Sequence, residues 1–233
     1  MSEVFPNAPL YEAVFQIRFA GELSVEVARA KIQDAVRSEL PKLYVPRAKE
    51  GQALALQAVQ LHSGDDTEMI GLAMNSFSYH TRRYAGYEAF QQRVRRFWAV
   101  FSEHVHVHQL VRVGLRYINH IPILRQNEDS PIPLRDYLNI GLDIPPRIRG
   151  DLIDFNTTLV ERTDEGVLRI AIEHKKVEAP PSEILLLDFD FAQKDGLLVS
   201  AVDEYLERAH RHTKRIFLEL VSEKYLAVMR SAR

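Results

Sequence analysis

The chain has 233 residues, of which 46% are hydrophobic and 27% charged, a composition typical of a soluble globular protein with its own core. Its 30 basic and 32 acidic residues leave a net charge of −2, which gives no overall attraction to nucleic acid or to an anionic membrane. The absence of cysteine excludes disulfides, thiolate metal sites and a cysteine nucleophile, and it favours a reducing, cytoplasmic location.

Residues 13–104 predict a strand, a helix, three short strands and a second helix. Apolar and polar side chains alternate at 13–19, and this period of two is typical of a half-buried strand. Residues 87–104 show the clearest helical periodicity, because their large apolar residues recur every three or four positions. The expected elements are a strand at 13–19, a helix at 24–40, strands at about 54–62, 68–75 and 77–84, and a helix at 87–104.

Residues 111–228 predict a similar order of elements with an irregular insertion. A strand at 111–118 alternates as the first strand does. The proline-rich segment 121–150 is expected to form a loop with one short helix near 134–138. The remaining elements are strands at about 151–161, 167–177 and 183–191, and one long helix at about 200–228.

Strands joined by hairpins and covered by helices indicate an α+β fold with a mostly antiparallel sheet. Ile17-Arg18-Phe19 resembles Leu115-Arg116-Tyr117 in the second starting strand, which predicts a duplicated unit of strand, helix, three strands and helix. Chance similarity between two amphipathic units is the alternative explanation. We expect halves at 1–108 and 109–233, either as packed domains or as one continuous saddle-like sheet. A helix-grip fold, with the sheet wrapped round the last helix, fits the same order.

Arg18 and Arg116 occupy matching positions on the two starting strands and point away from the apolar row of each strand. Asp188 and Asp190 have the same relation to the apolar residues of the last strand. Together with Tyr117, these residues predict a polar sheet face, or a cleft between the halves, that binds an anionic or peptide ligand. The alternative is a set of cross-strand ion pairs, each contributing less than about 1 kcal/mol.

A nucleic-acid surface is a second hypothesis. Residues 79–87 read YHTRRYAGY, and the last helix adds further basic residues. Aromatic rings stack on bases while arginines contact phosphates, so the candidate residues are Arg82, Arg83, Tyr84, Arg211 and Arg215. A solvated helix face and a charged strand edge explain the same residues without a ligand.

His104, His106 and His108 alternate with valines. On a strand the three imidazoles would share one face, and neutral imidazole is a good zinc ligand. The segment also lies at the expected end of a helix, where the helix dipole alone favours histidine. Because no nearby carboxylate completes a ligand set, we assign no metal and no cofactor.

Two segments carry a resemblance to a known family: Asn7-Ala8-Pro9-Leu10, which leads into the first strand, and Gly114-Leu115-Arg116-Tyr117-Ile118-Asn119. With the late Leu187-Asp188-Phe189-Asp190 strand and the long final helix, the chain resembles a sporadically distributed family of uncharacterised bacterial proteins over nearly its whole length. The GLRYIN stretch is the most specific part. The resemblance implies an accessory or defence-related role, and it brings no activity, cofactor or catalytic residue to this chain.

The sequence has no P-loop, GxGxxG, HExxH or GxSxG motif. We therefore predict a binding or regulatory module that takes a protein partner or a small ligand, or that self-associates. A nucleic-acid-binding protein, and an enzyme whose site is assembled from distant residues, are the alternatives. The N-terminus shows no signal pattern and no apolar run reaches the roughly 20 residues that span a bilayer, so we expect no membrane association.

Overall fold

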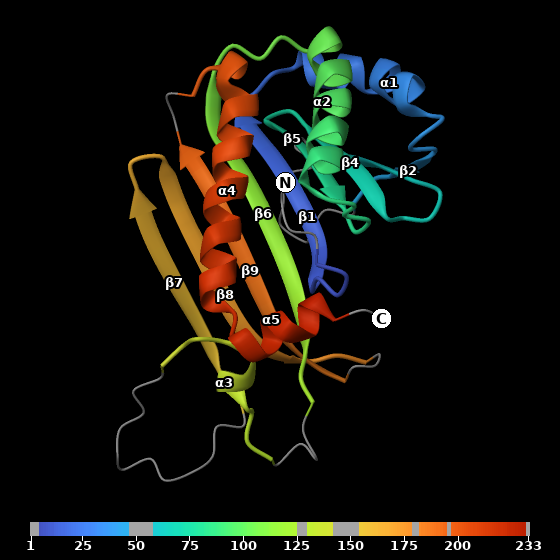
Figure 1. The fold of residues 1–233 in the computed structure, drawn as a ribbon. Coiled ribbons are helices and arrows are strands. Elements are labelled where there is room, and N and C mark those ends of the chain that lie inside the picture. The colour runs from blue at the N-terminus through green and yellow to red at the C-terminus, as the bar shows by residue number, and fades with distance from the viewer. Residues whose placement is uncertain are drawn as a thin grey trace.

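Nine strands form one antiparallel sheet in the computed structural model, within the described residues 5–46, 58–124, 130–141, 154–178, 182–194 and 197–231 (Figure 1). The strands are β1 (Leu10–Phe19), β2 (Lys42–Tyr44), β3 (Val59–His62), β4 (Glu68–Ala73), β5 (Ser76–Thr81), β6 (Leu110–Pro122), β7 (Asn156–Thr163), β8 (Gly166–Lys176) and β9 (Glu183–Lys194). Across the sheet they follow the order β2-β3-β4-β5-β1-β6-β9-β8-β7. The expected α+β class with an antiparallel sheet is confirmed.

β1 and β6 lie side by side in the middle of the sheet, as the blue and green strands of Figure 1. Their antiparallel register pairs Phe15 with Leu115 and Gln16 with Gly114. β2 to β5 extend beyond β1, and β7 to β9 extend beyond β6. The strands of both expected halves therefore belong to one continuous sheet, while the duplication of a unit stays a prediction.

Three helices cover one face of this sheet (Figure 1). α1 and α2 pack on each other and over β4 and β5, whereas α4 packs over β6 and β9. The helices are α1 (Ser24–Val36), α2 (Tyr87–His104), α3 (Leu134–Tyr137), α4 (Val202–Leu220) and α5 (Glu223–Arg230), with a 3-10 turn at Val199–Ala201. No helix in the described segments is long and apolar enough to cross a bilayer.

The main core lies between the helices and the sheet face that they cover. Because side chains alternate across a strand, Phe15 and Ile17 of β1 both point to the helix side, where they are fully buried. Phe97 and Phe101 of α2 are buried in the same cluster. Each such side chain contributes about 1.5–3 kcal/mol when it leaves water. The alternate, polar residues of the same strands point to the opposite side, which we call the helix-free face.

The single helix expected at about 200–228 is wrong, because the structure divides this segment into α4 and α5. Val221 has an extended backbone and forms an isolated bridge with Leu138. Ser222 then begins α5, since its Oγ accepts a hydrogen bond from the Tyr225 N–H at 3.1 Å. The break turns α5 away from the axis of α4 (Figure 1).

The remaining expected elements occur with shifted ends. The short helix near 134–138 is confirmed as α3, and the strand expected to reach residue 84 ends at Thr81 as β5. The strands expected from 54 and from 151 appear as β3 and β7, while residues 54–57 and 151–153 lie outside the described residues. The sequence did not predict the three-residue edge strand β2.

Candidate functional site

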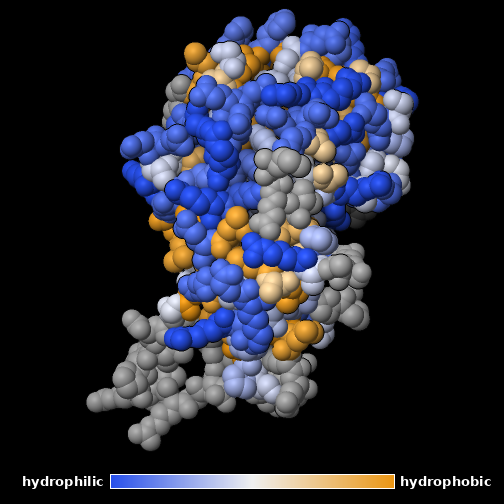
Figure 2. Space-filling model, viewed as in Figure 1, coloured by the Kyte–Doolittle hydropathy of each residue, from blue (hydrophilic) through white to orange (hydrophobic). Residues whose placement is uncertain are grey.

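A cleft of about 270 Å³ opens on the helix side, between α2, α4, α5 and the segment that leads into β1. Figure 2 shows hydrophobic atoms around the lower half of α4 and around α5, while most of the upper part of this face is hydrophilic. Side chains of β6 and β9 contribute to the lining. The apolar part of the lining includes Phe5, Leu10, Tyr117, Phe189, Phe217 and Met229.

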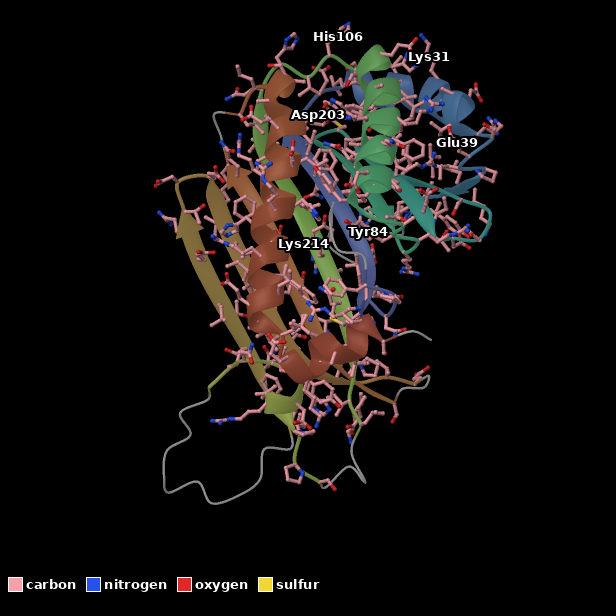
Figure 3. The ribbon with its side chains drawn as sticks, viewed as in Figure 1. Lys31, Glu39, Tyr84, His106, Asp203 and Lys214 are labelled. Carbon is pink, nitrogen blue, oxygen red and sulfur yellow. The ribbon has the colours of Figure 1, made fainter. Side chains whose placement is uncertain are left out.

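Two tyrosines reach the cleft from the start of α2. Tyr84 and Tyr87 lie on either side of Gly86, whose φ of 110° is in the region that favours glycine. Gly86 therefore lets the chain turn from β5 into α2 while both tyrosines line the cleft. Figure 3 labels Tyr84 in this segment and Lys214 on α4, two residues that line the cleft from different elements.

Hydrogen bonds fix α5 as a wall of the cleft. The Asn7 N–H donates to the Met229 carbonyl at 3.1 Å, and the Asn7 side-chain amide donates to the Ser231 carbonyl at 2.7 Å. Ser222 Oγ donates to the Asp136 carbonyl at 2.5 Å. These hydrogen bonds hold two walls of the cleft together: the segment that leads into β1, near the start of the chain, and α5, near its end.

Tyr117, Tyr87 and His210 form a hydrogen-bonded and stacked group in the cleft. Tyr117 Oη lies 2.9 Å from His210 Nδ1, and the Tyr87 ring stacks on the imidazole with centroids 4.0 Å apart. Burial, assisted by the positive charge of Lys214, lowers the pKa of His210 to about 4. Burial also raises the pKa of Tyr117 well above its ordinary value. The imidazole and the phenol are therefore uncharged at neutral pH.

Two buried hydroxyl groups of cleft residues have no hydrogen-bond partner among the described residues. They are Tyr87 Oη and Thr213 Oγ1, and Thr213 is only 1% exposed. A buried hydroxyl without a partner costs about 1–3 kcal/mol. An apolar cleft with a few polar groups of this kind is typical of a site that binds and orients a small ligand.

The helix-free face instead carries charged residues that pair with one another. Arg116 Nε and Nη2 each donate to Asp188 at 2.7 Å, and Arg112 Nη2 donates to both Asp190 oxygens at 2.6 and 2.8 Å. The hydrogen bonds to Asp188 raise the pKa of Arg116. These are the cross-strand ion pairs that the sequence analysis gave as the alternative to a binding site.

Arg18 lies on the same helix-free face, where its Nε donates to Gln16 Oε1 at 3.1 Å. Tyr117 does not: it points to the helix side and lines the cleft, because neighbouring side chains in a strand alternate. The predicted binding residues therefore divide between the two faces of the sheet, with Arg18 and Arg116 on one face and Tyr117 on the other. The sequence analysis missed Arg112 as the partner of Asp190, although the same alternation puts Arg112 on the helix-free face.

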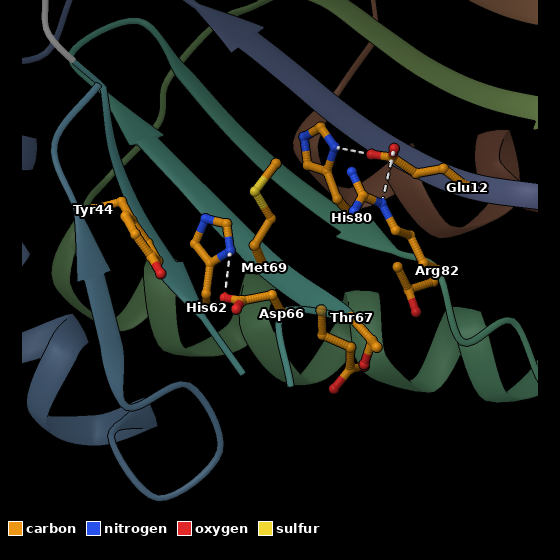
Figure 4. A pocket seen from close by; sticks show the side chains of 10 residues that line it. Glu12, Tyr44, His62, Asp66, Thr67, Met69, His80 and Arg82 are labelled. Atoms are coloured by element: carbon orange, nitrogen blue, oxygen red, sulfur yellow. Dashed lines mark hydrogen bonds and ion pairs between the residues drawn. The ribbon is translucent and has the colours of Figure 1, made fainter. Parts of the chain in front are cut away.

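A second hollow, of about 260 Å³, lies on the helix-free face beside β3, β4 and β5 (Figure 4). His80 Nδ1 lies 2.9 Å from Glu12 Oε1, and Arg82 Nε lies 3.7 Å from Glu12 Oε2. The hydrogen bond with His80 lowers the pKa of Glu12. His62 Nδ1 lies 3.5 Å from Asp66 Oδ1, and burial lowers the pKa of His62. Most charges of this hollow pair internally, and His62 Nδ1 is its buried nitrogen without a hydrogen bond among the described residues.

The structure divides the five nucleic-acid candidates between several sites. Arg82 lines the second hollow, and Arg83 forms an ion pair at 3.4 Å with a carboxylate of the β3–β4 turn. Tyr84 lines the cleft, whereas Arg211 and Arg215 line a groove beside it on α4.

The three alternating histidines do not lie on a strand. His104 is the last residue of α2, and His106 and His108 follow in a segment without strand structure. Figure 3 labels His106 near that end of α2. The described part of the chain contains no group of three or more histidine and carboxylate side chains that could hold a metal.

No protein-family model matches the chain, and no curated protein matches it at a significant level. The resemblance to the sporadically distributed bacterial family therefore stays a prediction. The geometry of the cleft is the basis for assigning a function.

Proposed function

We propose that the protein is a binding module that takes a small, largely apolar ligand in the cleft between α2, α4 and α5. One observation carries the proposal: Tyr87 and Thr213 line an apolar cleft, and the buried hydroxyl group of each has no hydrogen-bond partner among the described residues. A ligand that accepts or donates hydrogen bonds there relieves the cost of burying them.

The rest of the lining fits such a ligand. Aromatic side chains provide a large apolar surface, and they lose little conformational entropy when a ligand covers them. The uncharged Tyr117–His210 pair adds polarity without a buried charge that needs a counter-ion. The cleft therefore favours an apolar body with one or two hydrogen-bonding atoms.

A regulatory role is part of the same proposal. α2 belongs to the half expected at 1–108, and α4 and α5 belong to the half expected at 109–233. A ligand in contact with all three helices stabilises one arrangement of the two halves over others, and a protein partner can sense this difference. The absence of cysteine supports a cytoplasmic setting, and the family resemblance supports an accessory or defence-related pathway.

Fluorescence titration with phenylnaphthylamine, an uncharged dye that brightens in apolar sites, tests the cleft. We expect saturable binding of one dye per chain. Ala85→Trp, which places a large ring at an exposed position of the lining, should weaken this binding at least about tenfold, as a loss of roughly 1.4 kcal/mol. Val27→Trp adds the same ring to α1, at a position that is 78% exposed, and should leave the affinity unchanged.

Two outcomes contradict the proposal. In one, the wild-type protein does not bind the dye. In the other, Ala85→Trp binds the dye as tightly as Val27→Trp does. Thermal melting of both variants verifies that each one is folded.

A further inference from the structure

The cleft continues into a basic groove along α4. This groove, of about 400 Å³, is lined by Arg211, Lys214 and Arg215, together with the carboxylate of Glu207. The apolar cleft and the basic groove meet at four residues that line both of them, namely Tyr87, His210, Lys214 and Leu218.

Cations outnumber carboxylates in this groove. Arg211 Nη1 forms an ion pair at 2.8 Å with Glu207, one turn earlier on α4, and both side chains are more than half exposed. Such an exposed pair contributes little and rearranges easily when an anion arrives. Lys214 lines both the cleft and the groove, which places its positive charge where they meet, whereas the carboxylate of Glu88 lines the cleft only.

We infer that the ligand of the cleft is an amphipathic anion, with an apolar body in the cleft and a carboxylate, sulfonate or phosphate group on Lys214, Arg211 and Arg215. This inference depends on the proposed function, because it gives the chemical class of the ligand for the same site. The apolar body is buried among Tyr117, Phe189 and neighbouring side chains. The anionic group stays in the groove, where it is near the cations and keeps part of its hydration.

A nucleic acid fits the same geometry less well. Its phosphates would suit the groove, but a base carries several hydrogen-bonding atoms on its edges. Much of the cleft wall is apolar, as at Phe189, Phe217 and Met229, so it offers few hydrogen-bonding groups to match them. An apolar acid leaves fewer polar atoms without a partner.

Two dyes with nearly the same apolar body distinguish binding of the apolar body in the cleft from binding of the anionic group in the groove. Anilinonaphthalene sulfonate carries one negative charge, and phenylnaphthylamine carries none. We expect Lys214→Met to lower the affinity for the sulfonate dye about tenfold more than the affinity for the neutral dye, the effect of one lost charged hydrogen bond. Lys214→Arg should restore most of the loss, because it restores the charge.

Lys31→Met is the matched control, because Lys31 is exposed on α1 and lines neither the cleft nor the basic groove (Figure 3). Its affinities for both dyes should equal those of the wild type. If the neutral dye binds in the cleft but Lys214→Met affects both dyes equally, or neither, the anionic class is wrong and the proposed function stands. If neither dye binds in the cleft, the proposed function itself fails.

Competition with a short single-stranded oligonucleotide tests the remaining alternative, that the groove binds nucleic acid. If the oligonucleotide displaces the sulfonate dye from the wild type, and Lys214→Met abolishes this competition, the groove serves nucleic acid and our inference is overturned. Absence of competition, at an oligonucleotide concentration well above that of the dye, supports an apolar acid.

Discussion

Polar side chains on the two faces of the sheet differ in their hydrogen bonds. On the helix-free face, Arg116 and Asp188 form a two-point ion pair, and Arg112 forms another with Asp190. On the helix side, the cleft buries the hydroxyl groups of Tyr87 and Thr213 without partners among the described residues.

This difference indicates where a ligand belongs. Charges that already hold hydrogen bonds with a partly or fully buried partner have little to gain from a ligand, since binding must first break the existing bonds. Buried groups without partners lower the stability of the unliganded protein and gain a bond when a ligand arrives. The helix-free face therefore contributes to folding, and the cleft is the place to expect binding.

The largest expected effect concerns His210, which belongs to the cleft. Its pKa in the folded protein is about 4, below the ordinary value of 6.5, because burial disfavours the charged ring. Well above pH 6.5 the ring is neutral in both states. As the pH falls below 6.5, the unfolded chain binds a proton that the folded protein rejects, so stability declines. The expected loss from this group between pH 7 and pH 5 is on the order of 2 kcal/mol.

Chemical denaturation of the wild type and of His210→Gln at pH 7 and pH 5 measures this loss. The variant should lose less stability over the interval, by the amount that His210 contributes. His62 and His120, whose pKa values burial also lowers, are present in both proteins and cancel in the difference. Equal losses would mean that His210 is not buried in solution, which would remove one feature of the cleft.

The next largest effect concerns the helix-free face. Arg116→Met removes the main partner of Asp188, which is 5% exposed, and should lower the free energy of unfolding by about 1–2 kcal/mol. The effect stays at the low end of the range because Arg116 is half exposed and Arg169 remains 3.9 Å from Asp188.

The double variant Arg116→Met with Asp188→Leu is the control, because it removes both charges and leaves no buried carboxylate. It should be closer in stability to the wild type than the single variant is. Binding of the neutral dye should be the same in all three proteins. A change in dye affinity that follows the change in stability would show that the two faces are coupled, so that the helix-free face would contribute to binding as well as to folding.

Local patterns in the sequence predicted most of the fold. The alternation from Ala13 to Phe19 and the apolar period of residues 87–104 depend on which face of one element is buried, and β1 and α2 follow them closely. The break between α4 and α5 depends instead on contacts from outside the helix. Val221 bridges to Leu138, and the Ser222 N–H donates to the Tyr137 carbonyl at 2.8 Å. The spacing of apolar residues within one helix carries no information about such contacts.

The site was harder to predict for a related reason. Tyr84, Tyr117 and Thr213 come from three distant segments, and only the packing of α2 and α4 over the central strands brings them to one cleft. The pairing of Arg116 with Asp188 likewise depends on the register of β6 and β9. The side of the sheet that Tyr117 faces was predictable, because the alternation at 111–118 sets Tyr117 opposite Arg116.

The smallest expected effect is a change in stability whose sign distinguishes a buried hydroxyl without a hydrogen-bond partner from a buried hydroxyl that has one. Thr213→Val removes a buried hydroxyl that has no partner among the described residues, so the unliganded protein should become more stable by about 1 kcal/mol. For a chain of this size, that gain raises the melting temperature by about 2–4 °C. If the hydroxyl contacts the ligand, the same change should weaken binding, so stability and affinity move in opposite directions.

Thr81→Val is the matched control. Thr81 is also buried, at 2% exposed, but its Oγ1 accepts a hydrogen bond from the Arg83 N–H at 3.0 Å. The same substitution should therefore lower the melting temperature, because it leaves that N–H without its partner. Melting curves of the two variants beside the wild type decide the question. If both variants are destabilised alike, Thr213 Oγ1 has a partner in solution, and the observation that marks the cleft as a binding site loses its force.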